Sequence, residues 1–220
     1  MDINWTSGRF SNCILKGMMI RQEKNFMRPH RKMKKALVGI ISFLAAIFAV
    51  TICVTAGEPD QRYTMDQNYF SCDIPANWEL IRDKDKDEDY KIYEIQLVKG
   101  SASIFVSYYA ADNEDFNGYR DFMKRNSANV LGETRSAREN YEPVREITIG
   151  GRKGFELARE RLVYLHPQSK SDESMSLKEK QYVLPAKTGF YVLHLSTPKA
   201  IFPETMQVFE KIADSFKGMP

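Results

Sequence analysis

The stretch that decides the fold reads Tyr69-Phe70-Ser71-Cys72-Asp73-Ile74-Pro75-Ala76-Asn77-Trp78. Apolar and polar residues alternate along its first half, which places Phe70, Cys72 and Ile74 on one face of a β-strand. Pro75 has no N–H to donate to a strand ladder, so the strand is expected to end there. Trp78 then either turns inward as a large core anchor or lines a binding groove, and we expect the core position.

Downstream of this stretch the pattern alternates between strands and two helices. Gly100-Ser101 is expected to turn one hairpin, and Gly150-Gly151 a second. Apolar residues at helical spacing predict a helix across 115–130, with Phe116, Phe122 and Val130 in its stripe. Another amphipathic helix is expected to begin near Pro203. The strands are predicted near residues 69–74, 78–82, 91–98, 102–109, 144–149, 153–164, 176–184 and 189–196.

Short connections favour antiparallel neighbours, and the two helices must bury their apolar stripes against the sheet. The sequence therefore predicts an α+β fold, an antiparallel β-sheet sandwiched by α-helices, preceded by an N-terminal hydrophobic signal or anchor helix.

Both ends of this region resemble a known family. The opening 69–78 is similar to the strand, Ile-Pro and Trp arrangement of PsbP-like domains, and Phe209-Glu210-Lys211-Ile212-Ala213-Asp214-Ser215-Phe216 resembles their last helix. The strand 190–198 also fits the one that leads into that helix. The resemblance implies an α/β/α sandwich over about 69–217. It also implies a domain that binds or assembles other proteins rather than an enzyme, and it carries over no functional residue.

Upstream, residues 33–56 have the layout of an export signal. Basic Lys34 and Lys35 precede an apolar run, and small residues, Val54 and Ala56, stand before Gly57. The run 36–56 is also long enough to span a bilayer, so the segment is a cleaved signal peptide or a membrane anchor. A lipoprotein signal at Cys53 is disfavoured because the bulky Ile52 precedes it.

The expected organisation has four parts. Residues 1–32 are a disordered extension or a misassigned start, with Met27 and Met33 as alternative starts. Residues 33–56 are the signal peptide or anchor, 57–68 are a polar linker, and 69–217 are the PsbP-like domain.

Charge and cysteine content exclude some function classes. The net charge of the whole chain is +3, but residues 57–220 hold 23 basic and 27 acidic side chains. A mildly acidic domain lacks the electrostatic footprint of a nucleic-acid binder. Cys72 is the single cysteine after the leader, so it cannot form an intramolecular disulfide and is expected to be a buried small hydrophobe rather than a reactive thiol.

No catalytic motif stands out. His194 and Ser196 share one face of a predicted strand, so a serine–histidine pair of an exported hydrolase-like enzyme is an alternative function, although no acid partner is indicated. A zinc site made of Cys72, His166 and His194 has no supporting ligand spacing. No catalytic, cofactor-binding or metal-ligating residue is therefore assigned.

One acidic segment resembles a calcium loop. From Asp83 to Glu94, acids stand at loop positions 1, 3, 5 and 12, but Glu88 occupies position 6, where the sharp turn needs glycine. The flanks also read as strands, so an exposed acidic hairpin tip is expected. A divalent-cation-binding module is the remaining alternative.

The sequence thus predicts an exported, non-catalytic domain, periplasmic or extracellular, that binds an unidentified envelope protein or helps to assemble a complex. No cofactor and no nucleic acid are expected. Membrane contact is expected only through the N-terminal segment. If this segment is not cleaved, residues 36–56 are expected to anchor the protein in the inner membrane. Nothing in the sequence indicates the oligomeric state.

Overall fold

The computed structural model describes residues 60–84, 89–166, 168 and 172–219. The expected signal or anchor segment and the extension before it lie outside these residues. Of the helices within the described ranges, none has the length and apolar character needed to cross a bilayer.

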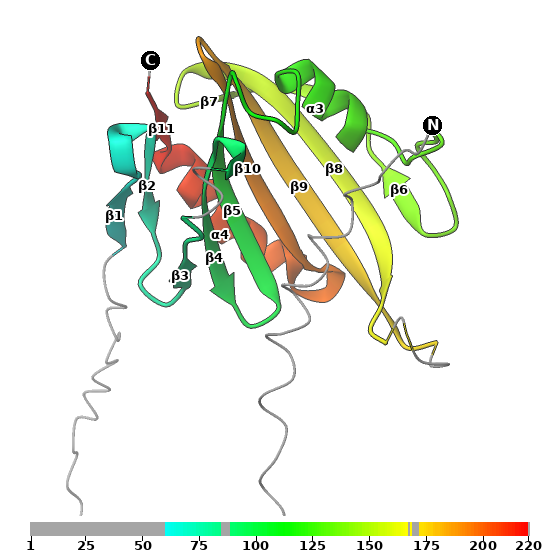
Figure 1. Cartoon of the computed structure of the whole chain (residues 1–220). Coiled ribbons are helices and arrows are strands. Elements are labelled where there is room, and N and C mark those ends of the chain that lie inside the picture. The colour runs from blue at the N-terminus through cyan, green and yellow to red at the C-terminus, as the bar shows by residue number, and fades with distance from the viewer. Residues whose placement is uncertain (1–59, 85–88, 167, 169–171, 220) are drawn as a thin grey trace, which may run out of the picture.

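The main element of the described chain is one antiparallel sheet of eight strands (Figure 1). Its strands follow the order β3-β4-β5-β10-β9-β8-β6, and β7 also pairs with β8. Two long hairpins, β4–β5 and β9–β10, meet where β5 pairs with β10. The strands are β3 (Glu79–Ile81), β4 (Ile92–Lys99), β5 (Ala102–Ala110), β6 (Glu139–Tyr141), β7 (Arg145–Ile149), β8 (Arg152–Tyr164), β9 (Ser174–Ala186) and β10 (Gly189–Pro198).

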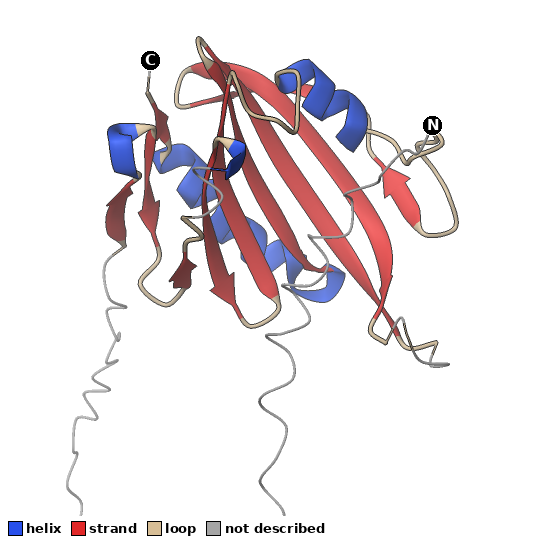
Figure 2. Cartoon of the chain, in the orientation of Figure 1, coloured by secondary structure: helices blue, strands red, loops and turns tan. Residues whose placement is uncertain are grey.

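The helices lie on opposite faces of this sheet (Figure 2). The longer, α4 (Phe202–Ser215), begins after the short 3-10 helix η2 (Lys199–Ile201), and Figure 1 shows it behind the sheet. The shorter, α3 (Tyr119–Asn126), lies in front of only the upper part of the sheet. The predicted α+β fold with helices on both faces is confirmed for the described residues.

Strand alternation divides the core into two apolar clusters, one on each sheet face. The cluster beneath α4 is the larger, and it includes Trp78, Phe209 and Phe216, each at most 8% exposed. The cluster beneath α3 contains Phe122 from the helix and Val183 and Phe190 from the sheet. Trp78 therefore anchors the core, as predicted.

A second, three-stranded sheet covers one end of α4. Its order is β1-β2-β11, with β1 (Gln61–Thr64), β2 (Phe70–Ile74) and β11 (Lys217–Gly218) all antiparallel. Phe70, Cys72 and Ile74 point into the core from β2, in agreement with the sequence pattern. Burial raises the pKa of the Cys72 thiol to about 12, which makes it unreactive near neutral pH.

The ordered chain starts earlier than the sequence analysis expected. Residues 61–68, assigned to a linker, instead form β1 and the 3-10 helix η1 (Asp66–Asn68). The register of β1 on β2 pairs Arg62 with Asp73, and Arg62 also donates to the carbonyl of Ser215. Met65, 1% exposed, enters the core. These tertiary contacts order a stretch whose own composition is polar.

The first predicted helix is shorter than expected. The range 115–130 contains helix only from Tyr119 to Asn126. Phe116 packs on the α3 cluster from the preceding loop, whereas Val130 is 74% exposed in a turn. Gly118, with φ 80°, stands before the first helical residue, so a helical course cannot run back through it. The helical spacing of Val130 was therefore coincidental.

Candidate functional site

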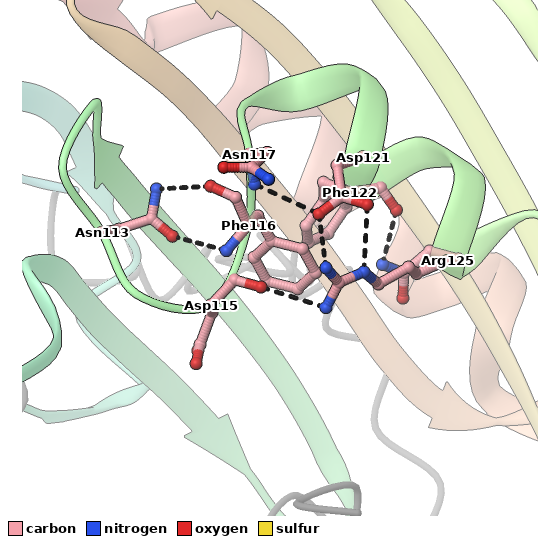
Figure 3. A network of polar contacts seen from close by, with 8 residues as sticks. Asn113, Asp115, Phe116, Asn117, Asp121, Phe122 and Arg125 are labelled. Carbon is pink, nitrogen blue, oxygen red and sulfur yellow. Dashed lines mark hydrogen bonds and ion pairs between the residues drawn. The ribbon is translucent and has the colours of Figure 1, made fainter. Parts of the chain in front are cut away.

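The position of α3 decides which part of the sheet face is covered. The loop before the helix is fastened by Asn113, which is 9% exposed (Figure 3). Its side-chain amide donates to the carbonyls of Ala110 at 2.7 Å and Phe116 at 3.2 Å, and its oxygen accepts from the N–H of Phe116 at 2.9 Å. These contacts bring Phe116 against the sheet and set the point at which the helix starts.

A second set of contacts ties the helix to this loop. The Arg125 guanidinium donates to both oxygens of Asp121 one turn earlier, at 3.1 and 2.6 Å, and to the carbonyl of Asp115 at 3.1 Å (Figure 3). Asp121 also accepts from the N–H of Asn117. The guanidinium carbon lies 5.2 Å from the centre of the Phe116 ring. The eight-residue helix is thereby held at one end of the sheet.

Strand register shows where the covered region ends. Under α3, Tyr109, Phe190 and Ile92 lie side by side on three strands and belong to the apolar cluster. Farther along the same face, the cross-strand rows become polar. One row runs Gln96, Phe105, His194 and Gln181, and the next runs Ser103, Ser196, Glu179 and Arg159. Together with Arg161, these residues form what we call the polar sheet face.

Glu179 lies at the centre of the polar sheet face with its carboxylate 1% exposed. Arg159 and Arg161, two residues apart on β8, each donate through Nε to a different oxygen of this carboxylate; the Arg161 contact measures 2.9 Å. Burial alone would raise the pKa of Glu179, but the neighbouring cations lower it to about 2. The carboxylate therefore remains ionised, with one arginine on each of its oxygens.

His194 lies across the strand pair from this clamp. Its ring stacks on Phe105 with centroids 5.6 Å apart, and its Nε2 atom is buried without a hydrogen-bond partner among the described residues. The pKa of His194 is lowered to about 4, chiefly by burial; Glu179 raises it, but Arg159 and Arg161 lower it further. His194 is thus neutral near pH 7, so the two arginines carry the stabilisation of Glu179.

Gln181 is the register partner of His194, and it too has a buried polar atom that lacks a hydrogen bond among the described residues. Its side chain is 7% exposed, and its Oε1 atom also has no hydrogen-bond partner within the described ranges. The space beside it is lined by Asn126 at the end of α3 and by Arg159 and Glu179. The two residues that carry these unpartnered buried atoms are therefore paired across β9 and β10, where the helix stops covering the sheet.

The polar sheet face does bring a carboxylate to the expected His194 and Ser196 pair. The arrangement is nevertheless not that of a nucleophile and its base. The Ser196 hydroxyl donates to Glu179 at 3.4 Å rather than to His194, and Ser196 is 3% exposed. A nucleophile requires a base within hydrogen-bond reach and access to substrate. The hydrolase-like alternative therefore gains no support from this geometry.

The calcium-loop alternative gains none either. Glu94, its twelfth position, lies within β4, is 8% exposed and accepts a hydrogen bond from Ser107 at 2.8 Å. Strand pairing places this carboxylate on the sheet face beside Ser107. Asp85 and Glu88 lie outside the described residues.

The three residues considered for zinc are separated. Cys72 belongs to the core beneath α4, His194 lies on the other sheet face, and His166 lies 3.6 Å from Glu173 in the loop after β8. Within the described part of the chain, no group of three or more potential ligands could hold a metal ion.

Sequence reasoning missed Arg159, Arg161 and Glu179. Arg159 and Arg161 are spaced for one strand face, but β8 and β9 carry charges on both faces, so alternation did not single them out. Only the pairing of Arg159 with Glu179 identifies the cluster.

Known proteins resemble this chain in structure but only weakly in sequence. No protein-family model and no curated protein matches this chain. Among solved structures it is similar to the PsbP of the cyanobacterium Synechocystis sp. PCC 6803, with 15% identity, a TM-score of 0.46 and coverage of 77% of this chain and 99% of that one. The predicted resemblance to PsbP-like domains is therefore found again among solved structures.

Two further similar structures come from other organisms. The Ran-binding protein Mog1p of Saccharomyces cerevisiae shares 11% identity at a TM-score of 0.41, covering 72% of this chain and 95% of its own. LpqN of Mycobacterium tuberculosis, described as involved in cell envelope biogenesis, shares 14% identity at a TM-score of 0.39, covering 75% and 88%. Likeness at this level concerns the fold and not the function.

Proposed function

We propose that this chain is an exported, non-catalytic domain that binds a protein partner through its polar sheet face. The observation that carries the proposal is the pair of buried, unpartnered atoms, Gln181 Oε1 and His194 Nε2, on neighbouring strands. A buried polar group without a hydrogen bond destabilises a fold by about 1–3 kcal/mol, so native proteins rarely keep one without a reason. A partner that supplies the missing hydrogen bonds recovers this energy on binding.

The surroundings of these atoms suit recognition better than catalysis. Half-buried Gln96 and Phe105 continue the row of His194, so a partner meets an aromatic platform flanked by two amides. The ionised carboxylate of Glu179 is paired with two arginines and is therefore unavailable as a base. The export part of the proposal rests on the basic and apolar pattern of residues 33–56.

The test uses replacements that remove the unpartnered atoms without leaving a cavity. The tagged full chain and the double variant Gln181→Met, His194→Phe are produced in the native cell, cross-linked and purified. We expect the parent to retain a partner in a constant ratio of partner to bait. The double variant should retain at least roughly tenfold less partner, which corresponds to about 1.4 kcal/mol of binding energy. Lys180→Gln, on the same strand but the opposite face, is the matched control and should retain the partner.

Stability separates binding from a structural role. Replacing unsatisfied polar groups by apolar groups of similar shape is neutral or stabilising. The double variant should therefore unfold at the same or a higher denaturant concentration while it loses its partner. A variant that keeps the partner, or one that loses it only because it unfolds, would contradict the proposal.

A further inference from the structure

A rigid turn after α3 presents two aliphatic side chains to solvent. Val130 is 74% exposed and Leu131 is 77% exposed, the two largest values among the exposed large hydrophobic residues of the described chain. Isolated exposed aliphatic residues are ordinary, but two consecutive ones in an exposed turn form a small apolar point.

The turn is held in place by one side chain. Asn129 Oδ1 accepts from the N–H of Leu131 at 3.0 Å and from the N–H of Glu133 at 2.9 Å, and its amide donates to the Glu133 carboxylate at 3.1 Å. The Asn129 backbone adds bonds to Glu133 and Gly132, each of 2.9 Å. Gly132, with φ 78°, permits the tight return. The fold thus orders Val130 and Leu131 in an outward position instead of burying them.

The sequence segment that contains this apolar point is basic, in contrast to the domain as a whole. Residues 124–138 contain four basic side chains and one acidic one, whereas residues 57–220 as a whole are net acidic. Within the described structure Lys124, Arg135 and Arg138 form no ion pair, whereas Arg125 is paired with Asp121. Arg138 instead lies over the Tyr164 ring at 5.1 Å.

We infer that the turn 129–133 is a membrane-contact tip that inserts Val130 and Leu131 into the surface of an anionic lipid bilayer. Aliphatic side chains enter the acyl boundary, and flanking lysine and arginine side chains are attracted to anionic headgroups. A fluid bilayer accepts a convex aliphatic tip without a complementary pocket. Protein hot spots instead favour Trp, Tyr and Arg at the centre of an interface, and the tip carries none of these. This contact adds to the N-terminal membrane segment expected from the sequence.

A position-specific fluorophore in the full chain tests this inference. The fluorophore is attached through Val130→Cys after Cys13→Ser and Cys53→Ser; Cys72 stays unlabelled because burial raises its pKa to about 12. The chain is reconstituted into phosphatidylcholine vesicles with or without phosphatidylglycerol, each containing headgroup-level nitroxide lipid as a quencher. Lys99→Cys, an exposed position at the far end of β4 from the α3 cluster, provides the matched control label.

We expect quenching at position 130 and not at position 99, and stronger quenching in anionic vesicles. Adding Leu131→Ser, or Lys124→Gln with Arg135→Gln and Arg138→Gln, should shift the equilibrium between inserted and free tip roughly tenfold toward the free form and so reduce quenching at position 130, because each removes part of the insertion energy. Equal quenching at both positions, or quenching at 130 that ignores lipid charge, would overturn the inference. So would a label at 130 that is shielded only when envelope proteins are added, since the tip would then dock on a protein.

Discussion

At the scale of single residues, the unusual groups of this protein are the ones that lack partners or change their ionisation. His194 and Gln181 each bury one polar atom without a hydrogen bond among the described residues, while Glu179 next to them is satisfied twice by arginine. The contrast lies within one small region of one sheet face. It separates groups whose hydrogen bonds are made within the fold from groups that we propose are completed by a partner.

His194 makes the stability of the domain depend on pH. Its pKa is about 4 in the folded protein and about 6.5 when unfolded, so the unfolded chain binds a proton first as pH falls. Stability is therefore complete above about pH 6.5 and should fall by roughly 2–3 kcal/mol as pH drops to about 4. Denaturant unfolding between these pH values measures the loss.

His194→Gln should remove most of this pH dependence, because a glutamine side chain does not titrate. The exposed His166→Gln is the control and should leave the pH profile of the parent unchanged. An unaltered slope in His194→Gln would show that another group causes the acid sensitivity. Glu179, whose folded pKa is about 2, affects stability at lower pH, since its stabilisation is lost as pH falls from about 4.5 toward 2.

Trp78 and Phe216 are structural residues at opposite ends of the chain's core. They are 8% and 4% exposed and belong to the cluster beneath α4. Truncating a large buried aromatic to alanine removes transfer energy and leaves a cavity, so Trp78→Ala and Phe216→Ala should each lower the free energy of unfolding by about 3–5 kcal/mol. Leu80→Ala, at 42% exposure, is the control with a change of less than about 1 kcal/mol. If Trp78→Ala unfolds like the parent, its core assignment is wrong.

At the scale of elements, local pattern predicted the long strands well and missed three of the short ones. The hairpins at Gly100 and Gly150 and the strands β4, β5, β8, β9 and β10 lie where alternation placed them. β1, β6 and β11 are short, at 4, 3 and 2 residues, and form because a neighbouring strand offers free ladder groups. Such pairing depends on residues far away in the chain, which local propensity does not report.

The loop before α3 is predicted to depend on one buried side chain. Asn113→Ala removes three hydrogen bonds and leaves the Phe116 N–H and two carbonyls without that partner. We expect a loss of about 1–3 kcal/mol in denaturant unfolding, the usual effect of unsatisfied buried groups. Asn117→Ala is the matched control, because its side chain is exposed and only its backbone N–H contacts Asp121. Equal stabilities of the two variants would refute a locking role for Asn113.

At the scale of the whole molecule, one sheet couples both cores. Strands β5, β9 and β10 contribute to the cluster beneath α4 through one face and to the cluster beneath α3 through the other. Neither cluster can lose its strands without exposing the other. We therefore expect residues 57–220, produced without the leader, to fold and to unfold in a single cooperative transition.

Calorimetry of that fragment provides the measurement. Agreement of the calorimetric and van't Hoff enthalpies supports a two-state domain. The core residues of both clusters lie between Met65 and Phe216, so the fragment contains all of them. Two resolved transitions, or no cooperative transition, would count against a self-contained domain.

The sequence by itself determined the fold class, the strand faces and the burial of Cys72 and Trp78, because each follows from the spacing of residues close in the chain. It also placed His194 and Ser196 on one strand face. Only the tertiary structure decided that Arg159, Glu179 and His194 meet, since they come from three strands whose register is set by pairing over distance. It also decided that α3 ends after Asn126, which leaves these polar rows beyond the helix and Val130 in solvent. The candidate site arises from these long-range choices, and no local pattern contains them.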